Sequence, residues 1–268
     1  MAARAELAVI GGSGFYSWLD DPVEVRPHTP YGPPSAPVAV GHVGGRSVAF
    51  LPRHGVAHEW PPHRVNYRAN LWALREVGVR RVIASCAVGS LRPDVQPGDV
   101  VVLDQLVDRT RGRPDTYLDG PIAGHVSFAD PYCPELGAVL AGAAEATGCR
   151  VHRGGTVVVV QGPRFSTRAE SRWFRSLGWD VVNMTQYPEA YLARELGMCY
   201  AGLAVVTDYD TGVEGDESVP PVSLGTVLAV LAANVDATRH LLDAAVPAIP
   251  DPAGCGCRAL GWPALAGP

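Results

Sequence analysis

Two short motifs in the first part of the chain combine glycine with groups that bind anions. In Ile10-Gly-Gly-Ser-Gly14 the glycines let the backbone turn tightly and approach an anion, and Ser13 adds a hydroxyl donor. In Leu51-Pro-Arg-His-Gly55, Arg53 and His54 can hold a phosphate through charge-assisted hydrogen bonds. Taken singly, the first motif also fits an ordinary tight turn and the second an exposed pair.

Four further polar motifs each follow an apolar run. They are Ser85-Cys-Ala-Val-Gly-Ser90, Gln161-Gly-Pro-Arg-Phe-Ser-Thr167, Asn183-Met-Thr185 and Thr207-Asp-Tyr-Asp210. Small and polar residues at the ends of successive strands are where α/β folds build ligand sites. Six such motifs together predict one shared ligand site.

The elements that position these motifs alternate along the chain. Short runs rich in β-branched residues predict buried strands at 7–10, 48–51, 82–84, 100–103, 157–160 and 201–206. Helical spacing of apolar residues predicts helices at 65–77, 135–147, 167–177, 187–196 and 224–246. This alternation predicts a single α/β domain with a parallel or mixed sheet. We place that domain at 1–246 and expect 247–268, rich in Pro, Gly and Ala, to be a loosely structured tail.

The composition narrows the classes of function. Hydrophobic residues make up 47% and charged residues 18% of the 268 residues, as in a soluble protein with a large core. A net charge of −5 argues against nucleic acid as a partner. No run reaches the length of a membrane span, and the N-terminal residues contain no signal-peptide hydrophobic region, so we expect a cytoplasmic protein without a membrane partner.

The six cysteines are irregularly spaced and imply no disulfide framework. Cys255-Gly-Cys257 is their one close pair, for which we expect reduced thiols, with a redox or metal role as the alternative. The histidine spacings match no metal-ligand template, so we assign no metal.

In this order, the motifs resemble the 5′-methylthioadenosine phosphorylase branch of the trimeric purine nucleoside phosphorylases. The resemblance covers the chain from Ile10 to about Val246, and its most specific stretches include Arg53-His54-Gly55, Val65-Asn-Tyr-Arg-Ala-Asn70 and Gly162-Pro-Arg-Phe-Ser166. It implies a single α/β domain around a central mixed sheet that closes partly into a barrel and is flanked by helices. It also implies a homotrimer, with inorganic phosphate as co-substrate and no further cofactor.

The resemblance also implies a role for each site residue. Phosphate would be held by six positions: Ser13, Arg53, His54, Cys86, Ala87 and Thr185. Ribose and base would meet Met184, Phe165 and Ser166, and the purine edge would meet Asp208 and Asp210. The pocket for the 5′ substituent would contain Leu224, Val227, Leu228 and, from a neighbouring subunit, His125. Relatives often carry a hydroxyl residue where this chain has Cys86, which is a weaker donor.

Mechanistically, phosphate would attack the anomeric carbon while the purine leaves with a proton at N7. A carboxylic acid at Asp208 can supply that proton if burial or the nearby charge of Asp210 raises its pKa. Adenine presents an amino group that needs an acceptor, whereas relatives that act on 6-oxopurines tend to carry Asn in place of Asp208 and Glu in place of Ser166. The expected reaction is therefore phosphorolysis of 5′-methylthioadenosine, or a related 6-aminopurine nucleoside, to adenine and 5-methylthioribose 1-phosphate.

Several alternatives stay open. Within the phosphorylases, adenosine, a 5′-halogeno-5′-deoxyadenosine or a 6-oxopurine nucleoside could be the substrate, because an apolar 5′ pocket separates such groups weakly. A nucleosidase that uses water would not need an anion site. A non-catalytic purine-binding protein would keep the base site alone.

Overall fold

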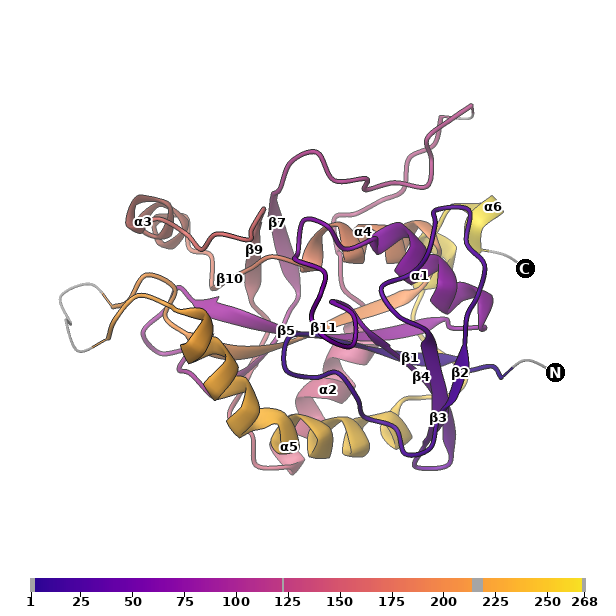
Figure 1. Ribbon diagram of the computed structural model, residues 1–268, viewed down its shortest axis with the longest axis horizontal. Coiled ribbons are helices and arrows are strands. Elements are labelled where there is room, and N and C mark those ends of the chain that lie inside the picture. Colours follow the sequence, from indigo (N-terminus) through magenta and orange to yellow (C-terminus); the bar gives the residue numbers. More distant parts are fainter. Residues whose placement is uncertain (1–2, 122, 214–218, 267–268) are drawn as a thin grey trace.

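A large mixed sheet with helices on both faces forms the body of the protein (Figure 1). The computed structural model describes residues 3–121, 123–213 and 219–266. The strands in chain order are β1 (Leu7–Gly11), β2 (Val23–Val25), β3 (Val38–Val43), β4 (Arg46–Pro52), β5 (Arg81–Ser90), β6 (Val100–Val102), β7 (Gln105–Arg109), β8 (Val151–Arg153), β9 (Thr156–Val160), β10 (Val181–Asn183) and β11 (Cys199–Asp208).

The helices are α1 (Tyr67–Glu76), α2 (Pro134–Ala146), α3 (Arg168–Ser176), α4 (Gln186–Glu195), α5 (Leu224–Ala248), the 3₁₀ helix η1 (Cys257–Leu260) and α6 (Pro263–Ala266). Each of the six predicted strands and five predicted helices is present. The strand expected at 82–84 was predicted too short, because β5 continues to Ser90 and includes the polar motif that was expected to follow it. The predicted single-domain α/β fold is thereby confirmed. Within the described part of the chain, none of the helices combines the length and apolarity needed to span a membrane.

Hydrogen bonding in the sheet runs almost completely around a ring. β5 pairs with both β10 and β11, β10 pairs with β9, β9 with β7, and β6 with β11. Because β6 and β7 are successive stretches of one extended segment, the pairing returns to β5. Leu103 and Asp104, between those two strands, belong to neither strand, although their N–H groups donate to the carbonyls of Gly202 and Gly155. The sheet is therefore partly closed into a barrel, as expected.

The two faces of the sheet carry separate apolar clusters. Along β1, Leu7 and Val9 point into the cluster that α2 and α5 cover, whereas Ala8 and Ile10 point into the cluster that α1 and α4 cover (Figure 1). All five residues of this strand are buried. A continuous apolar run, rather than an alternating one, is what a strand covered on both faces requires.

The strands β4, β1, β5 and β11 run parallel to one another. Their carboxyl ends therefore reach the same edge of the sheet, where the chain continues into Gly12, Arg53 and Asp210. This edge is where the polar motifs of the sequence come together.

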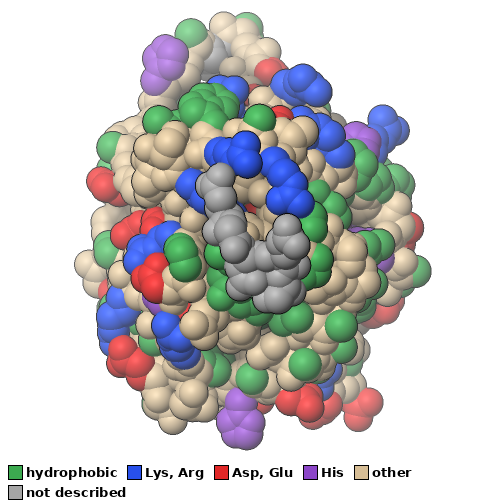
Figure 2. Space-filling model, turned by 90° about the vertical axis from the view of Figure 1, so that its left-hand side faces the viewer, with side chains coloured by type: hydrophobic (Ala, Val, Ile, Leu, Met, Phe, Trp, Pro, Cys, Tyr) green, Lys and Arg blue, Asp and Glu red, His purple; other side chains and the backbone are tan. Residues whose placement is uncertain are grey.

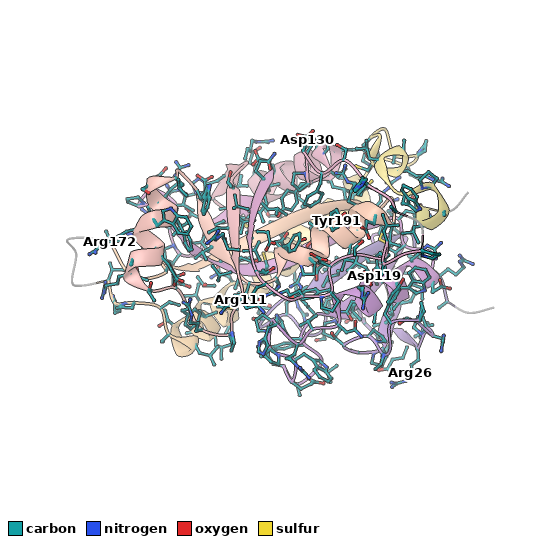
Figure 3. The ribbon with its side chains drawn as sticks, turned by 90° about the horizontal axis from the view of Figure 1, so that it is seen from above. Arg26, Arg111, Asp119, Asp130, Arg172 and Tyr191 are labelled. Carbon is teal, nitrogen blue, oxygen red and sulfur yellow. The ribbon has the colours of Figure 1, made fainter. Side chains whose placement is uncertain are left out.

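Residues 110–121 and 123–130 belong to an extended segment, called segment 110–130, that rises from the body between β7 and α2 (Figure 1). Seen from above, Asp119 and Asp130 of this segment lie on the same side of the molecule as Tyr191 of α4 (Figure 3). The carboxylate of Glu195, at the end of α4, accepts hydrogen bonds from Thr116 and from the backbone N–H of Tyr117. His125 lies farther along the segment and is exposed.

The segment after α5 was expected to be loose, but its described residues are tied to the body. The side chains of Arg46 and Arg81 donate hydrogen bonds to the carbonyls of Ile249 and Pro250. Farther on, the backbone N–H of Trp262 donates to the carbonyl of Glu195, at 3.0 Å. Long-range hydrogen bonds therefore supply order that the Pro- and Gly-rich composition does not predict.

Candidate active site

A cavity of about 320 Å³ lies at the carboxyl edge of the parallel strands. It is lined by the chain just after β1, β4, β9, β10 and β11, by the middle of β5 and by the start of α5. The predicted site residues among its lining are Ser13, Arg53, His54, Cys86, Ala87, Phe165, Ser166, Met184, Thr185, Asp208, Asp210, Leu224 and Val227. All six sequence motifs thus contribute to one cavity.

Two predicted residues are absent from that lining. Leu228 lies one turn along α5 from Leu224 and is 41% exposed. His125 is on the extended segment 110–130, where the neighbouring Gly124 packs beside Trp262 of the C-terminal segment. Within one chain, therefore, neither residue reaches the cavity that the sequence motifs form.

A buried ion pair fixes the basic end of the cavity. The Nε and Nη2 atoms of Arg53 donate to the two carboxylate oxygens of Glu189, at 2.7 and 2.8 Å, and Nη1 donates to the carbonyl of Ser85 at 2.8 Å. Neither side chain of the pair is exposed to solvent. Burial acts to lower the pKa of Arg53, but the charge and hydrogen bonds of Glu189 raise it above its ordinary value. The guanidinium is therefore held charged, in one orientation, with one N–H on each Nη atom left for a ligand.

Gly12 lets the backbone after β1 approach this guanidinium. A Cβ atom at this position would lie 2.7 Å from the carbonyl oxygen of Ser85 and 3.2 Å from Nη1 of Arg53. Only glycine fits without displacing one of them. The glycine-rich motif therefore lets the backbone approach the guanidinium closely, as its composition predicted. It also brings the adjacent Ser13 to the cavity wall.

His54 is neutral in this setting. Burial lowers the pKa of His54 to about 3, and the charge of Arg53 adds to that effect. Its Nδ1 atom lies 2.8 Å from the carbonyl oxygen of Trp60, which can only accept, so Nδ1 carries the proton and Nε2 remains an acceptor. His54 is thus placed to accept from a protonated oxygen of an anion, and Arg53 supplies the charge.

The thiol of Cys86 is held by a buried polar network that the sequence did not reveal. Gln186 donates from Nε2 to the sulfur at 3.3 Å, and its Oε1 accepts from the hydroxyls of Tyr132 and Tyr200, at 3.1 and 3.2 Å. Burial raises the pKa of Cys86 to about 12, so the group stays a thiol. Through this network, Gln186 positions the thiol of Cys86 beneath the cavity. The sequence did not indicate this role.

Asp208 ends β11 with both carboxylate oxygens bonded. The hydroxyl of Thr207 donates to Oδ2 at 2.7 Å, and the backbone N–H of Asp210 donates to Oδ1 at 2.7 Å. Burial raises the pKa of Asp208 to about 6 although these two hydrogen bonds act to lower it, and the charge of Asp210 adds a smaller upward effect. A carboxyl group with this pKa can both accept a hydrogen bond and donate a proton near neutral pH.

Two buried polar atoms at the same end have no hydrogen-bond partner among the described residues. They are Oδ2 of Asp210 and Oγ of Ser166, and both residues line the cavity. Burial raises the pKa of Asp210. The hydroxyls of Ser171 and Ser166 lie close enough to Asp210 to act against this rise, so they can turn either to its carboxylate or to a polar ligand at this end of the cavity.

The rest of the wall is apolar. Phe165 is 37% exposed and Leu224 59% exposed, whereas Val227 behind them is buried. Met184 packs closely against Gly162, where a Cβ atom would lie 2.6 Å from its sulfur. Figure 2 looks onto the left-hand end of the molecule in Figure 1 and shows basic and acidic side chains interspersed with apolar ones there.

Several lining or supporting residues were not predicted. The Oδ1 atom of Asn183 accepts hydrogen bonds from the backbone N–H groups of Thr185 and Gln186, with N···O distances of 2.7 and 2.8 Å. These bonds fix Thr185 at the cavity. His58 joins the lining beside His54, at a ring-centroid distance of 4.6 Å. Glu189 is the most consequential omission. Its one local signal is an acidic residue in the first turn of the helix that follows the Asn183-Met-Thr185 motif.

The cavity thus has a donor-rich end at Arg53 that suits an anion, an apolar middle and a carboxyl-containing end. This is the arrangement of an α/β enzyme that binds an anion and a polar ring side by side. A model of the Phosphorylase superfamily matches residues 6–247 of the chain. The chain belongs to the phosphorylase superfamily, which confirms at the family level the resemblance found in the sequence.

Three individual proteins are similar to the chain over most of its length. The chain is 64% identical over 220 residues to an S-methyl-5′-thioadenosine phosphorylase of Mycolicibacterium smegmatis, covering 81% of this chain and 82% of that one. It is 58% identical over 255 residues to a purine nucleoside phosphorylase of Streptomyces coelicolor, covering 92% and 90%. The structure of methylthioadenosine phosphorylase from Schistosoma mansoni in complex with adenine superposes with a TM-score of 0.86 at 39% identity, covering 92% of each chain.

The raised pKa of Asp208 predicts a pH-dependent cost in stability. Its carboxyl ionises near pH 6 when folded but near 3.8 when unfolded, so the stability that it contributes below pH 4 is lost as the pH rises to 6. Asp208→Asn should therefore exceed the wild type in free energy of unfolding by about 2–3 kcal/mol at pH 7.5 and match it at pH 4. Urea denaturation of both proteins at the two pH values, at one protein concentration, measures this. A difference that does not change with pH would contradict the assignment.

Proposed function

We propose that the chain splits 5′-methylthioadenosine, or a closely related 6-aminopurine nucleoside, with inorganic phosphate, releasing adenine and 5-methylthioribose 1-phosphate. The observation that carries the proposal is the pairing, in one cavity, of a fixed guanidinium with a carboxyl group whose pKa lies near 6. The names of the relatives in Mycolicibacterium smegmatis and Schistosoma mansoni support it.

Phosphate would occupy the basic end. Arg53 would donate its remaining N–H groups, Ser13 and Thr185 their hydroxyls, and His54 would accept from a protonated phosphate oxygen. Fixed there, the phosphate would attack the anomeric carbon of the ribose as the bond from that carbon to N9 breaks, and it would also stabilise the positive charge that develops on the sugar. The backbone at Ala87 and the thiol of Cys86 would complete this end.

The purine would occupy the opposite end. Asp208 would accept from the N6 amino group or, when protonated, donate to N7 as negative charge develops on the leaving base. Asp210 and Ser166 offer the two partnerless buried atoms to the same ring. Phe165 and Met184 would pack against base and ribose. An acceptor pair of this kind favours an amino group over a carbonyl at position 6.

The 5′ substituent would point toward the start of α5. Leu224 and Val227 present an apolar wall there, which suits a methylthio group and binds a hydroxyl less well. Apolar walls separate similar substituents only weakly, by about 1–3 kcal/mol. Adenosine and halogenated analogues therefore belong in the same substrate panel, and the Streptomyces coelicolor relative makes inosine a required member.

Phosphate dependence is the first test. Arg53 is a poor target because its loss would leave Glu189 buried without its partner, at a cost of about 3–5 kcal/mol in stability. Ser13→Ala instead removes one donor to a charged ligand, worth about 1.5–3 kcal/mol. It should raise the KM for phosphate at least about tenfold while leaving the KM for nucleoside within about twofold. Ser17→Ala, an exposed neighbour outside the cavity, is the matched control. Turnover that proceeds equally without phosphate would indicate a nucleosidase.

Base selectivity is the second test. Asp208→Asn keeps the shape of the side chain but removes the proton donor and places an amide donor beside N6. We expect kcat/KM for methylthioadenosine to fall by the equivalent of about 2–4 kcal/mol. The loss on methylthioinosine should be smaller, so the preference moves toward the oxopurine. Asp94→Asn, at an exposed ion pair with Arg92, serves as control. Equal losses on both bases would remove Asp208 from the purine edge.

We also propose that the protein is a homotrimer whose neighbouring subunit completes the 5′ pocket. Leu224 and Phe165 at the cavity, with Leu228 one turn farther along α5, leave exposed apolar surface for a second chain to cover. His125 lies on a segment that projects from the body. Light scattering should give three times the mass of one chain. His125→Ala should raise the KM for nucleoside but not for phosphate. Mixed oligomers of His125→Ala and Asp208→Asn chains should regain activity, because some sites then combine intact residues from both. An active monomer, or mixtures without recovery, would argue against the shared site.

A further inference from the structure

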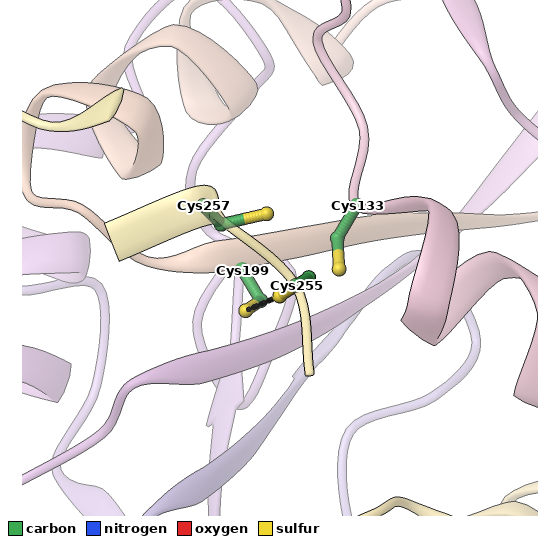
Figure 4. Close-up of side chains that lie close together, drawn as sticks. All are labelled: Cys133, Cys199, Cys255 and Cys257. Atoms are coloured by element: carbon green, nitrogen blue, oxygen red, sulfur yellow. Dashed lines mark hydrogen bonds between the residues drawn. The ribbon is translucent and has the colours of Figure 1, made fainter. Parts of the chain in front are cut away.

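Four of the six cysteines meet at a point well separated from the cavity (Figure 4). Cys133 is the N-cap of α2, Cys199 is the first residue of β11, and Cys255 and Cys257 lie in the segment after α5. We propose that these four cysteines bind one zinc ion through their thiolates, and that the ion fastens the C-terminal segment to the sheet.

The geometry suits tetrahedral coordination. The four sulfur atoms all lie within 4.8 Å of one another, and those of Cys199 and Cys255 are 3.2 Å apart. A zinc ion with Zn–S distances of about 2.3 Å places its four sulfurs about 3.8 Å apart. The observed range brackets that value, so small rotations of the side chains are enough to centre an ion. Among the described residues, no other group of histidine, cysteine or acidic side chains converges in this way.

The backbone at the ligands is held before any metal binds. The N–H of Cys133 donates to the carbonyl of Tyr200 at 2.8 Å, and the N–H of Cys199 donates to the carbonyl of Arg80 at 2.9 Å. On the C-terminal side, the N–H of Gly254 donates to the carboxylate of Glu135 at 2.7 Å. Two ligands therefore belong to the rigid body, and the other two follow directly after an anchored residue. A site pre-organised in this way loses little conformational entropy when it binds a metal.

The surroundings can carry the charge of such a site. Four thiolates and one zinc ion have a net charge of −2. A second cavity, of about 550 Å³, is lined by Cys133, Cys255 and Cys257 together with Arg194 and Arg153. Arg194 is buried and donates to the carbonyl of Asp130. Arg194 and Arg153 bring positive charge to this cavity wall, which Asp104 and Asp130 also line, and the cavity provides a route for the ion.

Disulfide formation is the competing chemistry for the same sulfurs. Two disulfides could use the same four sulfurs, but all four cysteines are free thiols here. The sulfurs of Cys199 and Cys255 lie 3.2 Å apart, beyond the S–S bond length of about 2.05 Å. A zinc ion accounts for all four at once, with three of the four buried and none of them at the active-site cavity. The Cys-x-Cys spacing lets one short turn supply two ligands to the same ion.

The site would act on the C-terminal segment and not on catalysis. Between Gly254 and Trp262 the described chain forms only one short 3₁₀ helix, and Cys257 is its one buried residue. Apolar burial therefore contributes little to holding this segment. A zinc ion would join it to α2 and β11 and close a loop that includes all of α5, which is the kind of cross-link that adds most to stability.

The test uses the full chain, purified under reducing conditions without chelator. Elemental analysis should give about one zinc per chain, and the same value for Cys149→Ser, a half-buried cysteine outside the cluster. Cys255→Ser and Cys257→Ser should each lower the zinc content and weaken zinc affinity at least about tenfold. Cobalt reconstituted into the reduced wild-type chain should give the thiolate-to-metal absorption and the strong visible bands of a tetrahedral sulfur site. This readout does not depend on whether a variant folds.

Removing zinc from the wild type should lower the unfolding temperature and increase proteolysis after α5. Because the cluster lies outside the cavity, kcat/KM for the nucleoside should change by less than about twofold. The proposal would be overturned if the fully reduced chain, with its four thiols free, bound neither zinc nor cobalt. It would equally be overturned if Cys257→Ser bound zinc as tightly as the wild type.

Discussion

The ion pair between Arg53 and Glu189 is the constraint on which the rest of the site depends. Its partners come from the end of β4 and from α4, and Ser85 of β5 and Tyr200 of β11 add hydrogen bonds to the same pair. Four elements are therefore fixed relative to one another at a point with no solvent access. A buried charge without its partner destabilises a fold strongly. The helix α4 must therefore pack on the sheet in the one register that places Glu189 against Arg53. That register also places Thr185, just before α4, at the cavity.

The same pair determines the electrostatics of the cavity. Glu189 neutralises most of the charge of Arg53, and burial keeps His54 neutral, so the basic end carries donors rather than a large net charge. Burial at the other end raises the pKa values of Asp208 and Asp210, so these carboxylates take up a proton more readily than exposed ones. A cavity of this kind can hold an anion at one end and receive developing negative charge at the other without strong repulsion between the two.

Much of this arrangement could be predicted from the sequence, because it rests on local patterns. Fully apolar runs such as Val157–Val160 predicted strands, and the polar motifs after β1, β4 and β11 converge because these parallel strands end at one edge. The motifs after β9 and β10 reach the same cavity although these two strands run antiparallel to β5. Strands with half-exposed residues, such as β7 and β8, lack such a run and were not predicted. Glu189 and Gln186 were not identified because their roles depend on which strand α4 covers. Their contacts, with Arg53 and Cys86, join residues far apart in the sequence, so no local pattern indicates them.

The C-terminal segment shows the same division between local and long-range information. Its Pro and Gly content indicates a chain with little tendency to form regular structure, and the short helices η1 and α6 agree with that composition. What orders it comes from elsewhere: Arg46 and Arg81 on the sheet, Glu135 on α2, and Cys133 and Cys199, which lie close to the two cysteines of the segment. Order in a segment with weak local preference has to be supplied by cross-links to rigid elements. Four convergent thiols are the strongest cross-link that its described residues offer.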